Sequence, residues 1–356
     1  MELDIAKIDK NFEVAKATDF SSNVYELPHP AFTVYGGWYD DEYGFIKMPP
    51  KIANDVSSGV FWGSRCTSGV RIAFSTNSDT IKLTCKPYQK GWSGHMTGLA
   101  RAGFTLCEVT DDGEKFVGNF YAPMEYVETY QAQLNLHGRY KMHDYILYLP
   151  LYSGVEALTV EVTKGSKVKK FTTYSDKKPF LYYGSSITQG GCANRPDNTY
   201  QSLVCQKYGV DYITLGFSGL ARGESNMAEY LGTVDCSVFV CDYDYNAQDL
   251  NHLEQTHLPM YKAFRANPKN AKTPIIFISK PDGFRTDCGN GRFAIIKKTY
   301  DYAKKLGDDN VYLIDGRKIY PKEIREHCSV DGCHPTDLGF YFMYKALDKV
   351  LSKIFK

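Results

Sequence analysis

The regular alternation of strands and helices after residue 179 constrains the fold most strongly. Short apolar segments are each followed by a stretch with helical character. Strict alternation of this kind predicts a parallel sheet with helices on both faces. The predicted strands cover residues 180–184, 211–218, 237–244, 274–281 and 310–316, and the predicted helices cover residues 198–208, 223–231, 250–267, 292–306 and 337–354.

The first half of the chain has a different pattern, in which short segments alternate apolar and polar residues between closely spaced turns. Segments 69–85, 101–120 and 143–162 each resemble two strands joined by a short turn. Many short strands with few helical stretches predict a β-sandwich, here a jelly-roll-like one. We therefore expect an all-β sandwich domain over residues 1–175 and an α/β domain over residues 176–356.

Composition excludes several classes of partner. The net charge is +1, from 42 basic and 41 acidic residues, and no basic stripe appears. Binding to nucleic acid or to an anionic membrane therefore has no support, and a neutral substrate fits better. Charged residues near the N-terminus argue against a signal peptide, which predicts a cytoplasmic protein. Ten cysteines without metal-site spacing predict reduced, mostly buried thiols. Whether the protein forms a homo-oligomer stays open.

Polar residues follow the ends of several predicted strands, where ligands bind in parallel sheets. Acyl transfer needs a nucleophile, a histidine, an acid that orients it, and donors to an oxyanion. Ser186 lies at a strand-to-helix turn, and Asp331 stands three residues before His334 on one loop. This spacing lets the carboxylate reach Nδ1 while Nε2 faces the serine. Gly219 offers a backbone N–H and Asn246 a side-chain amide.

Each of these residues has a plainer interpretation. A serine after a strand is commonly a turn or helix-capping residue, and Asn246 could cap the next helix. The pair Asp331 and His334 alone is weak. Their joint order along one α/β unit favours chemistry. Cys333, between the acid and the histidine, is interpreted as packing. Asp242 and Asp244 are interpreted as hydrogen-bonded loop acids rather than metal ligands.

Four motifs carry a resemblance to a known family. GSSIT (184–188), GFSG (216–219), YDYNA (243–247) and DGCH (331–334) resemble the four blocks of the SGNH (GDSL-type) hydrolase superfamily. The resemblance implies a three-layer, flavodoxin-like α/β/α domain without metal or other cofactor, which hydrolyses esters through an acyl-enzyme.

The resemblance also assigns roles to individual residues. It implies a catalytic triad of Ser186, Asp331 and His334, and an oxyanion hole formed by Ser186, Gly219 and Asn246. Ser185 departs from the family pattern, because it stands where the family usually carries an acid.

The third motif also departs from that pattern, because Tyr245 and Ala247 flank Asn246 where the family commonly has glycine and aspartate. The preceding sandwich is similar to that of two-domain bacterial SGNH esterases with a glycine-x-aspartate-leucine-tyrosine signature. GFTLC (103–107) lies at the corresponding place and keeps the glycine and the leucine.

The substrate is the least constrained feature. Trp38 and Trp92 lie in glycine-flanked segments where an aromatic face could receive a sugar ring, and His95 is close to Trp92 in sequence. Core packing of these side chains stays an alternative. We expect an esterase that removes small acyl groups, above all acetyl, from an acylated oligosaccharide. The alternatives are a short-chain lipase- or thioesterase-like hydrolase, and a carbohydrate-binding protein with an inactive hydrolase domain.

Overall fold

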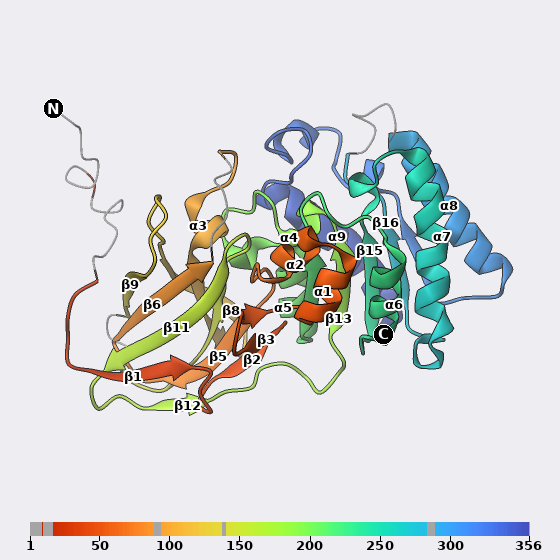
Figure 1. The fold of residues 1–356 in the computed structure, drawn as a ribbon. Coiled ribbons are helices and arrows are strands. Elements are labelled where there is room, and N and C mark those ends of the chain that lie inside the picture. Colours follow the sequence, from red (N-terminus) through yellow and green to blue (C-terminus); the bar gives the residue numbers. More distant parts are fainter. Residues whose placement is uncertain (1–8, 10–16, 89–93, 137–139, 283–288, 356) are drawn as a thin grey trace.

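The chain divides into a β-rich N-terminal part and an α/β C-terminal part that lie side by side (Figure 1). A computed structural model describes residues 9, 17–88, 94–136, 140–282 and 289–355. The last strand of the N-terminal part ends at Lys170, and the first strand of the C-terminal part begins at Phe180. The predicted boundary after residue 175 falls in the segment between them.

The N-terminal part contains two antiparallel sheets. Alternate residues of their strands, such as Ile72 and Phe74 in one sheet and Val160 and Val162 in the other, meet in a shared buried core. One sheet has the order β3 (Trp38–Asp40), β4 (Gly44–Ile46), β11 (Gly154–Thr163), β6 (Thr80–Tyr88) and β9 (Tyr130–Asn135), with β1 (Ser22–Leu27) paired to β11. The other has the order β12 (Val168–Lys170), β5 (Arg71–Thr76), β10 (His143–Tyr148), β7 (Phe104–Thr110) and β8 (Gly113–Phe120), with β2 (Thr33–Tyr35) paired to β5.

The predicted strand pairs are only partly correct. Strands β7 and β8 form the hairpin expected over residues 101–120. Strands β5 and β6, and likewise β10 and β11, are consecutive in sequence but belong to opposite sheets. Their connections cross the sandwich instead of closing a hairpin, because alternation of apolar residues defines the buried face of a strand and not its neighbour.

Among the described residues of this half, the structure has three α-helices that were not predicted: α1 (Pro50–Val56), α2 (Ser58–Ser64) and α3 (Gly98–Ala102). Each is short, and α2 contains Gly59 and Gly63, so their sequences show little helical periodicity. Ala53 of α1 and Val60 of α2 are buried in the same cluster as Met227 and Leu231 of the C-terminal part. Packing on the second domain therefore supplies their apolar surroundings.

The C-terminal part is a parallel sheet between two layers of helices, which confirms the predicted fold class. The strand order is β14 (Tyr212–Gly216), β13 (Phe180–Gly184), β15 (Val238–Asp242), β16 (Ile275–Ile278) and β17 (Val311–Ile314). The helices are α4 (Ser186–Gln189), α5 (Tyr200–Tyr208), α6 (Ser225–Thr233), α7 (Leu250–Ala266), α8 (Gly289–Lys305) and α9 (Asp337–Ile354).

Strand β13 shows how the layers arise. Phe180 and Tyr182 belong to the buried cluster that includes side chains of α5 and α9. Leu181 and Tyr183 belong to the cluster that includes α6, α7 and α8. Both faces of the strand are thus covered, which explains why its sequence is continuously apolar.

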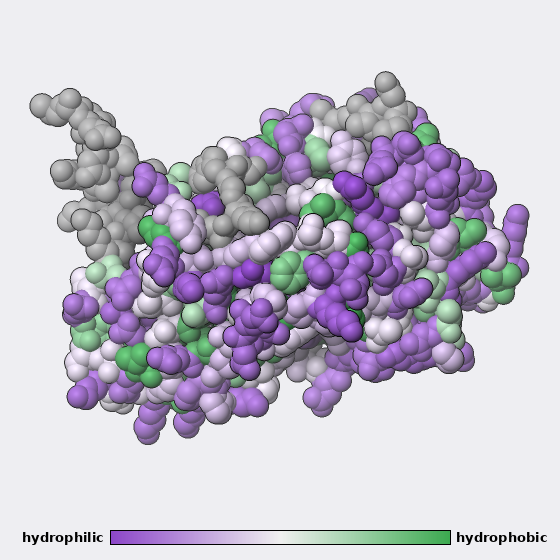
Figure 2. All heavy atoms as spheres, in the orientation of Figure 1, coloured by the Kyte–Doolittle hydropathy of each residue, from purple (hydrophilic) through white to green (hydrophobic). Residues whose placement is uncertain are grey.

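The face of the molecule drawn in Figure 2 is polar for the most part. On the face drawn in Figure 2, apolar side chains form small separate patches between hydrophilic ones. Within the described ranges, no helix has both the length and the hydropathy that crossing a bilayer requires.

Candidate active site

The structure brings Ser186, His334 and Asp331 into one hydrogen-bonded chain. Ser186 is the first residue of α4, and only Ser185 separates it from the carboxyl end of β13. Its Oγ lies 2.8 Å from His334 Nε2, and His334 Nδ1 lies 2.7 Å from Asp331 Oδ2. These distances are those of a nucleophile, its general base and the acid that orients the base.

A tight loop fixes the positions of Asp331 and His334 relative to each other. Ser329 and Pro335 form a bridge at its base, and the Val330 N–H donates to the carbonyl of His334 at 2.9 Å. Asp331 Oδ1 accepts hydrogen bonds from the backbone N–H groups of Cys333 and His334 at 2.9 and 2.7 Å. The carboxylate therefore fixes both the backbone of the loop and the ring of His334.

These hydrogen bonds also set the charge of Asp331. Partial burial opposes its ionisation, but hydrogen bonds from the backbone and ring of His334 and from the Cys333 N–H outweigh burial. Together they lower the pKa of Asp331 to about 2. An ionised Asp331 accepts the Nδ1–H of His334 and leaves the Nε2 lone pair for the hydroxyl of Ser186.

The two further candidate oxyanion donors follow the neighbouring strands. Gly219 lies beyond β14 with φ +73°, a backbone conformation that favours glycine. Asn246 ends a short 3₁₀ helix after β15, and its Nδ2 donates to the carbonyl of Phe217 at 2.9 Å. One amide hydrogen thus fixes the side chain against the loop before Gly219. The second is the candidate donor to an oxyanion. Asp249, not Asn246, caps α7.

Ser185, which departs from the family pattern, has a structural role in this chain. Its Oγ accepts the N–H of Ile187 at 3.2 Å and so caps α4. An acid nearby comes instead from the end of β15, where Asp242 accepts hydrogen bonds from Thr188 Oγ1 and the Tyr200 hydroxyl at 2.8 and 3.0 Å. Asp242 is also hydrogen-bonded to the backbone of Ser185, and burial raises its pKa to about 8.

The N-terminal domain contacts the nucleophile directly, through a residue that the sequence had not indicated. The Tyr152 hydroxyl, in the connection from β10 to β11, donates to the carbonyl of Ser186 at 3.1 Å. Next to it, the carbonyl of Leu151 accepts from Gln189 Nε2 at 3.2 Å, and Gln189 Oε1 accepts the Ser218 N–H at 2.9 Å. The sandwich, α4 and the loop before Gly219 are therefore linked by hydrogen bonds.

A buried lysine makes a second connection from the sandwich to this loop. Lys47 follows β4, and its Nζ donates to the carbonyl of Gly216 at 3.0 Å and to Ser68 Oγ at 2.9 Å. The ammonium also lies 5.1 Å from the ring centre of Phe217. Burial lowers the pKa of Lys47 to about 8. Its partners lie 21 and 169 residues away in sequence, so local pattern could not reveal it.

The three predicted sugar-binding residues have different outcomes. The ring of His95 lies 5.3 Å from that of His334, which places this exposed side chain beside the candidate base. Trp38 is 40% exposed on β3, and within the described residues no hydrogen bond or ring contact joins it to Ser186 or His334. Trp92 lies outside the described residues.

The remaining polar residues near the site agree with their plainer interpretations. Burial raises the pKa of the Cys333 thiol, which disfavours the nucleophilic thiolate. Asp244 is buried and accepts the Lys280 N–H at 3.2 Å, and Arg292 donates to its backbone carbonyl. Burial raises the pKa of Asp244 to about 6.

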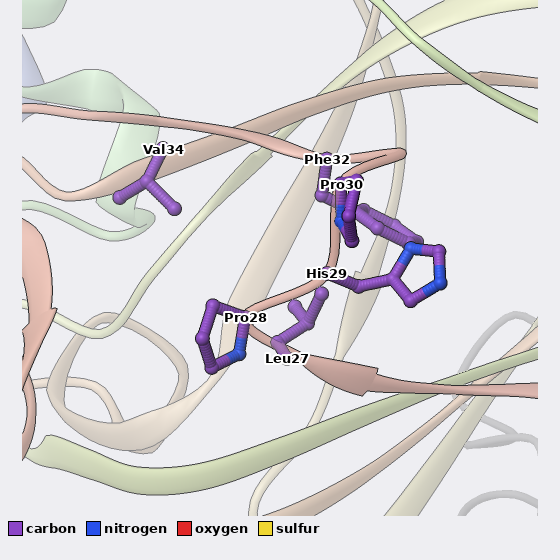
Figure 3. A pocket seen from close by; sticks show the side chains of 6 residues that line it. All are labelled: Leu27, Pro28, His29, Pro30, Phe32 and Val34. Carbon is purple, nitrogen blue, oxygen red and sulfur yellow. The ribbon is translucent and has the colours of Figure 1, made fainter. Parts of the chain in front are cut away.

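An apolar pocket of about 300 Å³ lies elsewhere, in the N-terminal domain (Figure 3). None of its lining residues belongs to the four motifs. They come from β1, β2 and the segment between them: Leu27, Pro28, His29, Pro30, Phe32 and Val34.

Together, fold and site define the class of the protein: a two-domain α/β protein with a serine-hydrolase-like constellation at the carboxyl edge of a parallel sheet. The chain belongs to the SGNH (GDSL-type) hydrolases. Residues 177–352 match the GDSL-like lipase/acylhydrolase family, and residues 26–168 match GxDLY, the N-terminus of SGNH-hydrolase-type esterases. The expected resemblance to SGNH esterases with a GxDLY-type N-terminus is thereby confirmed, although residues 103–107 keep only two signature positions.

Solved structures show the same two-domain arrangement. A protein described as a GDSL-like lipase from Bacteroides ovatus is 25% identical with a TM-score of 0.83, over 94% of this chain and 98% of that one. The salicylyl-acyltransferase SsfX3 of a tetracycline biosynthetic pathway is 17% identical with a TM-score of 0.77, over 94% and 97%. A family two carbohydrate esterase from Cellvibrio japonicus is 12% identical with a TM-score of 0.59, over 94% and 98%. No curated protein sequence matches the chain.

Proposed function

We propose that this SGNH esterase hydrolyses small acyl esters, above all O-acetyl groups, on carbohydrate hydroxyls through an acyl-enzyme. One observation carries the proposal: the unbroken chain of hydrogen bonds from Ser186 through His334 to Asp331. Such a chain makes a hydroxyl nucleophilic, and it argues against a binding protein with an inactive domain.

In the proposed first step, His334 Nε2 takes the proton of Ser186 as Oγ attacks the ester carbonyl. The positive charge on the imidazolium is stabilised by ionised Asp331, which stays deprotonated. The tetrahedral intermediate collapses when His334 returns the proton to the leaving sugar hydroxyl. A water molecule then attacks the acyl-enzyme with the same histidine as base, and the acid is released.

The developing oxyanion would be held by the N–H groups of Ser186 and Gly219 and by the amide of Asn246. Each such donor contributes about 3 kcal/mol to transition-state stabilisation in comparable sites. The carbonyl of Phe217 fixes the Asn246 amide before substrate arrives. A fixed donor needs little reorganisation during the reaction, which is the main source of its effect.

Three observations support a carbohydrate as the alcohol part of the substrate. The net charge of +1 gives no attraction to a polyanion. His95 is exposed beside His334 and can donate a hydrogen bond to a sugar hydroxyl. The fold is shared with a family two carbohydrate esterase, although this likeness concerns the fold alone. A cytoplasmic location stays a prediction, and it would favour imported oligosaccharides as substrate.

Acetate release from acetylated xylo- and manno-oligosaccharides tests the proposal. The wild-type protein should release acetate, and Ser186→Ala should lower the rate by at least about 10³-fold because it removes the nucleophile. A wild-type protein that releases no acetate from either substrate would exclude the carbohydrate assignment.

A lipase- or thioesterase-like hydrolase is the competing activity. A series of p-nitrophenyl esters of increasing acyl length separates the two. Rates should be highest for acetate and fall with chain length. Rates that rise with chain length would contradict the acetyl assignment while leaving the serine esterase chemistry intact.

A further inference from the structure

Two imidazoles and one thiol lie close together, and one of the imidazoles belongs to the candidate general base His334. His95, Cys192 and His334 each have a ligand atom, and these three atoms all lie within 4.8 Å of one another. They come from three separate segments: the N-terminal domain, the turn after α4, and the loop before α9. We propose that these side chains form a binding site for Zn²⁺, through which the metal reversibly inhibits the proposed esterase.

The donor set is one that Zn²⁺ prefers. Imidazole nitrogen and thiolate sulfur are its usual protein ligands, and three of them leave a fourth position for water. In a tetrahedral site the ligand atoms are about 3.5 Å apart, given metal–ligand bonds of about 2.0–2.3 Å. Because the atoms lie within 4.8 Å of one another, each pair must approach by at most about 1.3 Å. His95 is the exposed member of the three residues, and Cys192 is the buried one.

The backbone at Cys192 gives a second, independent reason to single out this place. Cys192 has φ +72°, in the left-handed region that residues other than glycine rarely adopt. Strain of this kind concentrates at functional sites. The turn also runs close to the reacting groups, since the N–H of Gly191 donates to the carbonyl of Ser186 at 2.8 Å. The Cys192 side chain is buried, with 4% of its surface exposed.

The geometry of His334 explains why metal binding would inhibit. Nδ1 is hydrogen-bonded to Asp331 at 2.7 Å, which leaves Nε2 as the ligand atom. Nε2 is also the atom 2.8 Å from Ser186 Oγ that must accept the serine proton. One lone pair cannot bind a metal and a proton at once, so metal binding and general-base catalysis exclude each other. A chelator should restore activity.

Cobalt spectroscopy tests the site without any assay of activity. Co²⁺ replaces Zn²⁺ in such sites, and a thiolate ligand then gives a charge-transfer absorption in the near ultraviolet. Wild-type protein should show this band, and Cys192→Ser should lose it. Cys333→Ser is the control, because Cys333 is a second thiol next to His334, half-buried where Cys192 is buried. This variant should leave the band unchanged. No band in the wild type, or a band that persists in Cys192→Ser, would overturn the proposal.

Inhibition assays test whether metal binding at this site blocks catalysis. This part depends on the proposed function, and p-nitrophenyl acetate serves as substrate. Zn²⁺ should inhibit the wild type reversibly, with activity restored by a chelator. Cys192→Ser and, as a second variant at an exposed position, His95→Ala should each raise the inhibition constant at least about tenfold, as expected for loss of one ligand. Cys333→Ser should not.

The two tests fail separately. Equal inhibition of the wild type and Cys192→Ser, or activation by Zn²⁺, would overturn the inhibitory site. A cobalt band in a protein that hydrolyses no ester would support the metal site and reject the proposed function.

Discussion

At the scale of single residues, Asp331 has more influence than its place in the triad alone suggests. Its two oxygens accept three hydrogen bonds, two from the backbone of its own loop and one from the ring of His334. Because these bonds lower the pKa of Asp331 to about 2, the residue is ionised above about pH 4. Its protonation therefore does not limit activity near neutral pH.

Asp331→Asn should lower kcat by about 10⁴-fold, because the amide favours the wrong tautomer of the histidine. KM should change much less, since the hydrogen bonds of Asp331 go to its own loop and to the ring of His334. Steady-state kinetics with p-nitrophenyl acetate measures both quantities. A loss of less than tenfold in kcat would show that Asp331 does not orient His334 during the reaction.

At the scale of elements, the loop between β14 and α6 depends on a lysine from the other domain. Lys47 donates to the carbonyl of Gly216, and the next carbonyl, of Phe217, accepts from Asn246. Displacement of this loop would move two of the candidate oxyanion donors, Gly219 and Asn246, together. The ammonium group thus positions the loop and does not touch the substrate.

Lys47→Met should lower kcat about tenfold with little change in KM, because it removes the charged donor and leaves the Gly216 carbonyl without this hydrogen bond. Lys47→Arg should restore part of the loss. Lys82→Met is the matched control: Lys82 is a buried lysine of the same domain that pairs with Glu161 and not with the loop. If both methionine variants lose kcat equally, Lys47 has no specific role in positioning.

The elements show what the sequence could and could not predict. The strands of the parallel sheet were predicted to within a few residues because both faces are buried and their apolar runs are continuous. Helices α1 and α2 were missed because packing against residues far away in sequence stabilises them. Gly59 and Gly63 of α2 lie against Leu220 and Phe217. Ala53 of α1 is buried in the same cluster as α6. The candidate partners of Ser186 could be predicted because they follow the ends of predicted strands. Lys47 and Tyr152 could not be predicted, since only tertiary contacts bring them to the site.

At the scale of the whole molecule, the sandwich is part of the site rather than a separate module. Three of its side chains contact the site: Tyr152 contacts Ser186, Lys47 contacts the loop before Gly219, and the ring of His95 lies beside that of His334. Helices α1 and α2 share a buried cluster with α6 (Figure 1). The C-terminal domain alone would therefore lose contacts that hold its reacting groups in place.

Stability should depend on pH through Asp242, which is buried where β15 ends. Its pKa is raised to about 8, so the folded state keeps a proton that the unfolded state releases above about pH 4. The free energy of unfolding should thus fall as pH rises from about 4 to 8, by up to about 1.4 kcal/mol per pH unit from this group. Asp242→Asn cannot ionise and should flatten this dependence.

Urea unfolding at a series of pH values measures the effect. Asp315→Asn is the control. Hydrogen bonding to Arg317 outweighs burial and lowers the pKa of Asp315. Asp315 is therefore ionised in both states above pH 4 and adds nothing to the pH dependence of stability there. The pKa of Asp244 is also raised, to about 6. The free energy of unfolding of Asp242→Asn should therefore still fall with pH between about 4 and 6. Identical slopes in the wild type and Asp242→Asn would mean that Asp242 is ionised in the folded state.

The central claim is that Ser186 is an activated nucleophile, and covalent labelling tests it most directly. A fluorophosphonate reacts with serine hydroxyls that a general base activates. We predict that the wild-type protein takes up one label, that peptide mass spectrometry places it on Ser186, and that Ser186→Ala takes up none. A wild-type protein that stays unlabelled, or that carries the label on Ser185 or another residue, would contradict the account.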